Sequence, residues 1–420
     1  MTDTASWDWT TPEKVTEIQG WQERFRWVEE LQVSPDGERV AAIVNVDEGE
    51  FQVCVSGDVW ESTFDKIWHL RYLPDGRLFG FVSDMGEWTV AVDGKPWENR
   101  FGYVWNPIWS VDGSRLAVAF QQDMRYGMAV EDAPWEETFA NATYFAISPD
   151  GSKTAGAVQV EPADSGEVHK FQKGTFSAAL DGRAWEARFV NVWHLAVSAD
   201  GSRLAAEVRR SLYDYTIVVN GTPWEKNFAC VWEPCFNPQT GTVVAPVREG
   251  GRWGLAEDGK LIWDARYAQL WQLQYSPQGD HLAAVAAPKF GRWTAAVDNA
   301  AWPITFSDMV CDLRFSPDGT RLALLGKEGP HWKIAVDRKV WSHSYDMAWK
   351  PVFSPDGTVV AAKVEIDGRY SVAVNDRLWS RQCEAVWDPV FSPDGGHLLL
   401  RSIEKGRYLR RIVPVSDIIG

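Results

Sequence analysis

Residues that commonly carry out catalysis or bind metals are few in this chain, and they are spread over its length. The 420 residues include seven histidines and five cysteines, and no two histidines are four residues apart, the spacing of paired zinc ligands on a helix. The sequence has no G-x-S-x-G nucleophile elbow, no G-x-x-x-x-G-K-[ST] phosphate loop and no G-x-G-x-x-G dinucleotide loop. We therefore expect no catalytic residue, no metal site and no bound cofactor, and a protein that is not an enzyme.

The cysteines, the net charge and the hydropathy indicate in which compartment the protein is found and which classes of partner it does not bind. No C-x-x-C pair occurs, so we interpret the thiols as buried in a reducing compartment; they are Cys54, Cys230, Cys235, Cys311 and Cys383. The formal net charge of −16 disfavours binding to nucleic acid. The N-terminus has no apolar signal-peptide core, and no run reaches about 18 apolar residues. We expect a cytoplasmic protein without direct membrane insertion, which can dock at the inner face of the cytoplasmic membrane.

Polar side chains that differ from one another recur at one position, four residues before the serine of a repeated Ser-Pro-Asp-Gly turn. Two arginines lie two residues further along the same run. We predict that these residues face a central channel, as a ligand or partner site at its mouth; the alternative is a water-filled pore that binds nothing. The candidates are His69, Arg71, Asn106, His194, Glu233, Gln272, Asp312, Arg314, Lys350 and Asp388.

These candidates are positioned by a repeat. Its turn glycines lie 37 to 40 residues apart, except for one interval of 50, and they are Gly37, Gly76, Gly113, Gly151, Gly201, Gly241, Gly279, Gly319, Gly357 and Gly395. Each repeat holds four short apolar runs, and the third and fourth are joined by a turn such as Asp93-Gly94, a strong hairpin signal. Four strands in about 40 residues are typical of a β-propeller blade.

We therefore predict an all-β fold, a single closed β-propeller of ten four-stranded blades. Two five-bladed rings and an incomplete ring are the alternatives. We expect residues 1–14 to be an N-terminal tail and residues 15–420 to form the propeller, with a long hairpin loop at 157–175 in the fourth repeat.

The fourth run of each repeat has a tryptophan followed, four residues later, by an aromatic in nine of ten copies. The first copy, Trp21–Phe25, precedes any complete repeat, and the last repeat has no copy, so we expect a strand near residues 15–25 to complete the last blade. Of the 25 tryptophans, 21 occupy repeat positions, which favours packing between blades. Aromatic platforms for sugars or peptides, and a chain for electron hopping, are the alternatives.

The turns at Ser354–Gly357 and Ser392–Gly395, each before an apolar run, resemble the WD40-like repeats of TolB-type propellers. The Pro-Trp-Glu steps at Pro96–Glu98, Pro134–Glu136 and Pro223–Glu225, in an acidic tryptophan-rich chain, are similar to the TmcD family of cytoplasmic subunits in the Tmc transmembrane redox complexes of sulfate-reducing bacteria. This resemblance implies a cofactor-free subunit whose companions are a membrane cytochrome b, an iron–sulfur subunit and a periplasmic multihaem cytochrome c.

Together these observations predict a non-catalytic propeller scaffold that holds other subunits of a membrane-associated electron-transfer complex on the cytoplasmic side. The alternative is a propeller that binds a small ligand or carbohydrate, or hydrolyses one, at the channel mouth.

Overall fold

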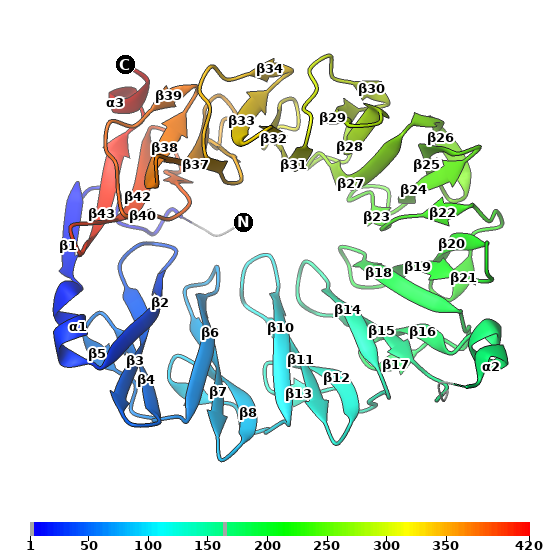
Figure 1. Cartoon of the computed structure of the whole chain (residues 1–420), viewed down its shortest axis with the longest axis horizontal. Helices are drawn as coiled ribbons and strands as arrows, with labels where there is room; N and C mark the ends of the chain where they lie inside the picture. The colour runs from blue at the N-terminus through cyan, green and yellow to red at the C-terminus, as the bar shows by residue number, and fades with distance from the viewer. Residues whose placement is uncertain (1–3, 163–165) are drawn as a thin grey trace. The chain divides into compact units, whose positions relative to one another are not determined.

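The computed structural model describes residues 4–162 and 166–420, which form ten antiparallel sheets in chain order (Figure 1). Each sheet is a meander of β-propeller blade type, so the predicted all-β fold with ten blades is confirmed. The chain divides into two compact units. Unit 1 consists of Trp60–Arg266 with Glu48–Gln52, and unit 2 of Tyr267–Gly420 with Val53–Val59 and the segment that ends at Asp47. That the blades close into one ring stays a prediction.

Unit 1 contains five sheets, apart from Tyr267 at the end of the last strand. They are separated here by semicolons: β6 (Lys66–Tyr72), β7 (Leu78–Asp84), β8 (Glu87–Val92), β9 (Lys95–Pro96); β10 (Tyr103–Trp109), β11 (Leu116–Gln122), β12 (Arg125–Val130), β13 (Ala133–Pro134); β14 (Ala142–Ile147), β15 (Thr154–Gln159), β16 (Phe176–Leu180), β17 (Arg183–Ala184); β18 (Asn191–Val197), β19 (Leu204–Arg209), β20 (Tyr215–Val219), β21 (Thr222–Pro223); β22 (Cys230–Val231), β23 (Cys235–Phe236), β24 (Val243–Glu249), β25 (Arg252–Glu257), β26 (Lys260–Tyr267). A short helix, α2 (Val168–Lys173), lies between β15 and β16, in the segment predicted as a long loop.

The other five sheets belong to unit 2, apart from Glu50–Gln52 of the first: β2 (Trp27–Val33), β3 (Val40–Asp47), β4 (Glu50–Val55), β5 (Asp58–Val59); β27 (Gln269–Tyr275), β28 (Leu282–Lys289), β29 (Arg292–Val297), β30 (Ala300–Ala301); β31 (Met309–Phe315), β32 (Leu322–Glu328), β33 (His331–Val336), β34 (Lys339–Val340); β35 (Met347–Ala348), β36 (Val352–Phe353), β37 (Val360–Ile366), β38 (Arg369–Val374), β39 (Arg377–Leu378); β40 (Ala385–Val386), β41 (Val390–Phe391), β42 (His397–Glu404), β43 (Arg407–Pro414), β1 (Glu13–Glu17). The helices are α1 (Gln19–Arg24) and α3 (Ser416–Ile419).

The Ser-Pro-Asp-Gly turns join the first and second strands of the blades. In the copy that starts at Ser354, the serine hydroxyl donates to Asp356 Oδ1 at 2.5 Å and accepts from the Val359 amide at 2.9 Å. Gly357 closes the turn with φ of +74°, a conformation that a side chain would strain. The Asp93-Gly94 hairpin likewise has φ of +47° and +81°, as a type I′ turn requires.

The fourth run is not a full strand in most blades, which corrects the sequence-based expectation. In the second blade the ladder ends at β9, and Phe101 makes only an isolated bridge to Trp88. The amides of Glu98 and Asn99 instead donate to the carboxylate of Asp132 in the next blade, at 2.7 and 3.1 Å. Because these N–H groups donate to a turn of the next blade, they do not take part in the strand pairing of their own sheet.

The fourth-run tryptophans are packing residues, as predicted. Nine of the ten are buried, and the exception, Trp185, is half-buried. Trp302 and Phe306 are typical, because they pack with Val310 and Leu324 of the next blade in one core cluster. The repeated spacing therefore fixes how these two blades of unit 2 pack against each other.

The last blade ends in an N-terminal strand, but this strand is not the tryptophan motif. The strand β1 runs antiparallel to β43, with Val15 opposite Leu409 (Figure 1). Trp21 lies in helix α1 rather than in a strand, so the expectation for Trp21–Phe25 was wrong in secondary structure. The strand also starts inside the segment assigned to a tail. Trp21 and Phe25 nevertheless occupy the usual core with Tyr408, because the helical turn brings both rings to it.

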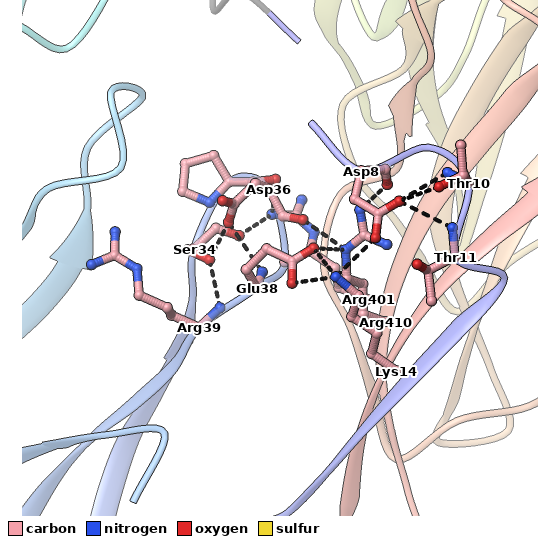
Figure 2. Close-up of polar contacts among 12 residues, drawn as sticks. Asp8, Thr10, Thr11, Lys14, Ser34, Asp36, Glu38, Arg39, Arg401 and Arg410 are labelled. Carbon is pink, nitrogen blue, oxygen red and sulfur yellow. Dashed lines mark hydrogen bonds and ion pairs between the residues drawn. The ribbon is translucent and has the colours of Figure 1, made fainter. Parts of the chain in front are cut away.

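A polar network joins the N-terminal segment, the first turn and the last blade within unit 2 (Figure 2). Lys14 Nζ lies 2.9 Å from Asp8 and 2.7 Å from Glu38, and Glu38 also pairs with Arg410 at 3.0 Å. Arg410 is 1% exposed and donates to the carbonyl of Asp36 as well. Each of the four charged side chains in this network therefore lies beside one of opposite charge, which permits the burial of Arg410.

Candidate functional site

The predicted site residues lie on the first strand of each blade or directly beside it, at a backbone irregularity. The pairing of β31 with β32 shifts register between Cys311 and Arg314, and Asp312 has φ of +52°. The same repeat position has positive φ, between +49° and +58°, in six blades: Glu30, His69, Asn106, Tyr144, Gln272 and Asp312. This is a β-bulge with a left-handed residue, a conformation in which Asn, Asp and His are enriched.

The bulge changes the interpretation of these residues in two ways. The backbone conformation itself favours several of the polar residue types, so a solvated channel is not needed to explain them. The bulge also interrupts the two-residue alternation of a strand, so the spacing alone does not place Arg71 and Arg314 on the same face as His69 and Asp312. Arg314 is close enough to Asp312 to feel its charge.

Four candidates precede proline. Asn106, before Pro107, lies in the continuous strand β10, whereas at the other three the first strand of the blade is split in two. Glu233, Lys350 and Asp388 are followed by Pro234, Pro351 and Pro389 and lie between short strands such as β35 and β36. Proline has no N–H for the ladder and disfavours helical φ and ψ before it. The side chains of Glu233, Lys350 and Asp388 therefore extend from a stretch of backbone that belongs to neither short strand.

The candidates do not form one group. His69, Arg71 and Asn106 belong to unit 1 and Gln272 to unit 2; the His69 ring stacks on Phe81 with centroids 5.4 Å apart. The structure brings candidates together in two clusters. One surrounds His194 and Glu233 in unit 1, and the other surrounds Asp312, Arg314, Lys350 and Asp388 in unit 2. A functional role for either cluster stays a prediction.

The unit 1 cluster is built on a buried carboxylate. His194 Nδ1 lies 2.8 Å from Glu207 Oε2, and the Glu207 side chain is only 5% exposed. The Tyr144 ring meets the imidazole edge-on at 5.2 Å. Burial raises the pKa of Glu207, and the hydrogen bond to Glu207 raises the pKa of His194; the nearby Glu233 carboxylate raises both further.

A histidine–carboxylate pair can act as a general base if a nucleophile lies beside it. The ionisable thiols of this cluster are Cys230, which feels the charge of Glu207, and Cys235, which feels that of Glu233. Burial raises the pKa of Cys235 to about 12 and also raises that of Cys230, so neither is a thiolate at neutral pH. The pair therefore has no thiolate nucleophile among these two cysteines.

The unit 2 cluster is rich in cations. Lys363 Nζ lies 4.2 Å from the ring centroid of Trp349 and 4.9 Å from that of Tyr370, a double cation–π contact. Arg314 Nε is inaccessible and has no hydrogen-bond partner. No ion pair involves Arg314, Lys350 or Lys363 in the part of the chain that the structure describes. Burial lowers the pKa of all three groups, and for Lys350 the charge of Arg314 lowers it further.

Sequence reasoning missed three charged residues on second strands, one beside the unit 1 cluster and two beside the unit 2 cluster. Glu207, Lys363 and Arg401 occupy the position that in other blades holds apolar residues, and Arg401 donates to the Asp388 carbonyl at 2.7 Å. The signal was present in the sequence as a charge inside an otherwise apolar run, at the repeat position of Ala119, Ala157, Val285 and Leu325.

A second set of tryptophans lies five residues before the turn serine or its equivalent, and each pairs with an aromatic residue of its own blade. The set is Trp68, Trp105, Trp193, Trp232, Trp271, Trp349 and Trp387. Trp232 stacks on Trp253 at 5.4 Å with an interplanar angle of 7°, and Trp271 lies 4.6 Å from Trp293. All seven tryptophans at this position are half-buried. Trp27, at 64% exposure, is the most exposed tryptophan in the described residues. Binding of sugars or peptides on these rings, and electron hopping between them, stay hypotheses.

The described residues contain no cluster of three or more His, Cys, Asp or Glu side chains arranged to hold a metal ion. They also contain no helix with the length and hydropathy needed to cross a membrane. All five cysteines are free thiols; Cys54 and Cys383 are buried as predicted, whereas the other three are half-buried.

Comparisons with known proteins show little beyond the fold. No family model and no curated protein matches the chain. The crystal structure of a eukaryotic initiation factor aligns with a TM-score of 0.47 and 14% identity, over 79% of this chain and 90% of that one. The β-propeller domain of Cps50 (Swd1) from Myceliophteria thermophila aligns with a TM-score of 0.32 and 15% identity, over 65% and 97%. Neither likeness bears on function, and the resemblance to the TmcD family finds no support among these matches.

Proposed function

We propose that this chain is a non-catalytic interaction protein, a propeller scaffold whose innermost-strand side chains contact partner proteins. One observation carries the proposal. Turns, hairpins and fourth-run cores are built alike in nearly all blades, whereas the bulge position differs from blade to blade and presents different charges. A rigid scaffold with a variable polar surface is suited to recognising proteins.

The finer form of the proposal is a subunit of a membrane-associated electron-transfer complex at the cytoplasmic face. The net charge of −16 makes direct adsorption to an anionic membrane unfavourable, so the attachment would run through a membrane-bound partner such as a cytochrome b or an iron–sulfur subunit. We propose no cofactor for this chain itself. The absorption spectrum of the purified protein checks this point, because haem or an iron–sulfur cluster would absorb between about 350 and 600 nm.

Affinity purification of the tagged chain from native membranes tests the proposal. We expect partner proteins to co-purify, and fewer of them with the charge reversals Glu233→Lys and Lys350→Glu. Lys339→Glu is the matched control, since Lys339 is an exposed lysine on β34, away from the bulges. Recovery of the chain alone from the soluble fraction at every salt concentration would contradict the proposal.

The second candidate function is binding of a small ligand, and the unpaired cations of unit 2 favour it. Carbohydrate binding and hydrolysis lack a comparable observation. The raised pKa values of Cys230 and Cys235 count against a thiol-dependent hydrolase at the unit 1 cluster.

A further inference from the structure

We propose that Arg314, Lys350 and Lys363 form a binding site for an oxyanion, that is, a carboxylate or phosphate group. The site lies on β31, on the open stretch between β35 and β36, and on β37. It goes beyond the interaction role, because it assigns a ligand chemistry to named residues and can be tested on the isolated chain.

Two of the three cations, Lys350 and Lys363, lie on adjacent backbone segments of the same blade. The Trp349 amide donates to the Lys363 carbonyl at 3.0 Å, and Lys350 is the residue that follows Trp349. The Lys363 ammonium lies over the Trp349 ring at 4.2 Å. The Trp349 ring thus holds the Lys363 ammonium beside the backbone segment that carries Lys350. Neither lysine forms an ion pair within the described residues.

The third cation comes from the preceding blade. Arg314 follows the bulge of β31, its Nε–H has no acceptor, and its charge reaches Lys350 strongly enough to lower the pKa of that lysine. Because Nε is inaccessible, a bound oxyanion would contact the half-buried guanidinium through its terminal nitrogens, and charge-assisted hydrogen bonds to Arg314 and Lys350 would stabilise both cations.

The fold itself does not require the charge of Lys363. The position of Lys363 is Leu325 in the preceding blade and Val285 in the one before, and both are buried apolar residues. The chain as a whole is acidic, so a local group of unpaired cations is against the trend of its composition. The acids whose charges act on these lysines are Asp312, Asp388 and Glu365. Asp312 and Asp388 are exposed, Glu365 is half-buried, and none of the three forms an ion pair with the lysines. They leave the ammonium groups available to an incoming anion.

Isothermal titration calorimetry of the purified chain with inorganic phosphate, and separately with citrate, tests the site at constant ionic strength in chloride. We expect saturable binding of one anion per chain. Lys350→Gln and Arg314→Gln should each weaken binding about tenfold, as expected for the loss of one charge-assisted hydrogen bond. Lys363→Leu should weaken it similarly, and the preceding blade shows that leucine fits that position.

Lys339→Gln is the control, because it removes the same charge from an exposed lysine of the neighbouring blade. Circular dichroism must show that each variant is folded, and exposed Lys350 is the substitution least able to disturb the fold. Absence of saturable binding by either anion would overturn the proposal. It would also be overturned if Lys339→Gln weakened binding as much as Lys350→Gln, which would show only non-specific attraction.

Proton uptake and competition add two independent readouts. A bound anion raises the lowered pKa of Lys350, so affinity should fall as pH rises through that pKa, and binding should take up protons there. A hexaglutamate peptide that displaces phosphate would assign the site to an acidic segment of a partner. Phosphate binding without displacement would assign it to a free small anion, and both results support an oxyanion site. A failed titration would leave the co-purification test unaffected.

Discussion

Replacing Trp302 by alanine tests whether the repeated tryptophans hold the blades together. Trp302 is 4% exposed and packs with Phe306 in its own blade and with Val310 and Leu324 in the next. Its amide donates to the Ala295 carbonyl at 2.8 Å, a backbone bond that the substitution retains. The change therefore removes the indole and little else.

The expected loss follows from the area that the indole buries. A buried tryptophan removes about 150–250 Å² from water, and about 25 cal/mol for each Å² gives about 4–6 kcal/mol. This range is an upper bound because the unfolded chain is already partly compact, and measured Trp→Ala losses in protein cores are about 3–5 kcal/mol. We expect the free energy of unfolding to fall by about 4 kcal/mol.

Urea unfolding followed by far-ultraviolet circular dichroism measures this loss, as a lower midpoint concentration. Tryptophan fluorescence is unsuitable because the substitution removes a fluorophore. Trp27→Ala is the matched control: Trp27 is 64% exposed, so a change within about 0.5 kcal/mol is expected. If Trp302→Ala lowered the midpoint no more than Trp27→Ala, packing between blades would not be the role of these residues.

Three further predictions concern single contacts and pH. Gly326→Ala should destabilise the fold by about 1–3 kcal/mol, because a Cβ at Gly326 would lie 2.5 Å from the Phe306 ring; thermal unfolding measures this. Tyr408→Phe should lower the free energy of unfolding by about 1–3 kcal/mol, because the buried Tyr408 hydroxyl donates to the Gly37 carbonyl at 2.7 Å; urea unfolding measures this. Asp200 has its pKa lowered to about 2 by hydrogen bonds, so its stabilising contribution should disappear as pH falls from about 4 to 2, which a pH series of melts would show.

Each of these predictions has a matched control. Gly80→Ala should cause no clash, since its nearest neighbours are 3.5 Å away, and equal destabilisation by Gly80→Ala and Gly326→Ala would refute the steric argument. Tyr213→Phe, at a residue 77% exposed, should leave stability unchanged. Ser198→Ala removes the main donor to Asp200 and should flatten the dependence on pH; an unaltered pH profile would contradict the assignment.

Local signals in the sequence were sufficient to predict the blades. The period of the turn glycines and the Asp-Gly hairpins are properties of a few adjacent residues, so they predicted ten meanders correctly. The fourth run was harder, because the amides of Glu98 and Asn99 bond to Asp132, more than thirty residues ahead. Spacing alone does not reveal such a competitor for backbone N–H groups.

The site was predicted only in part, for a similar reason. Its residues were found as a polar repeat position, but the bulge that sets the backbone of Asp312 depends on pairing with a second strand. The partner charges, Glu207 and Lys363, lie in runs that resemble core strands, and only comparison of repeats with one another singles them out. The N-terminal strand was expected from the missing motif, yet it formed at Glu13–Glu17 because β43 pairs there and Trp21 packs from a helix.

The shortness of the fourth strands also has a consequence for self-association. Eight of the ten sheets in the described residues end in an outer strand of two residues, too short to template an added strand. The N-terminal edge, β1, carries Glu13, Lys14 and Glu17. The edge of β26 is different, with eight residues and with Leu261 and Ile262 39% and 47% exposed. In concentrated solution a strand from another molecule would therefore add first at β26, and a lysine at Ile262 would protect that edge.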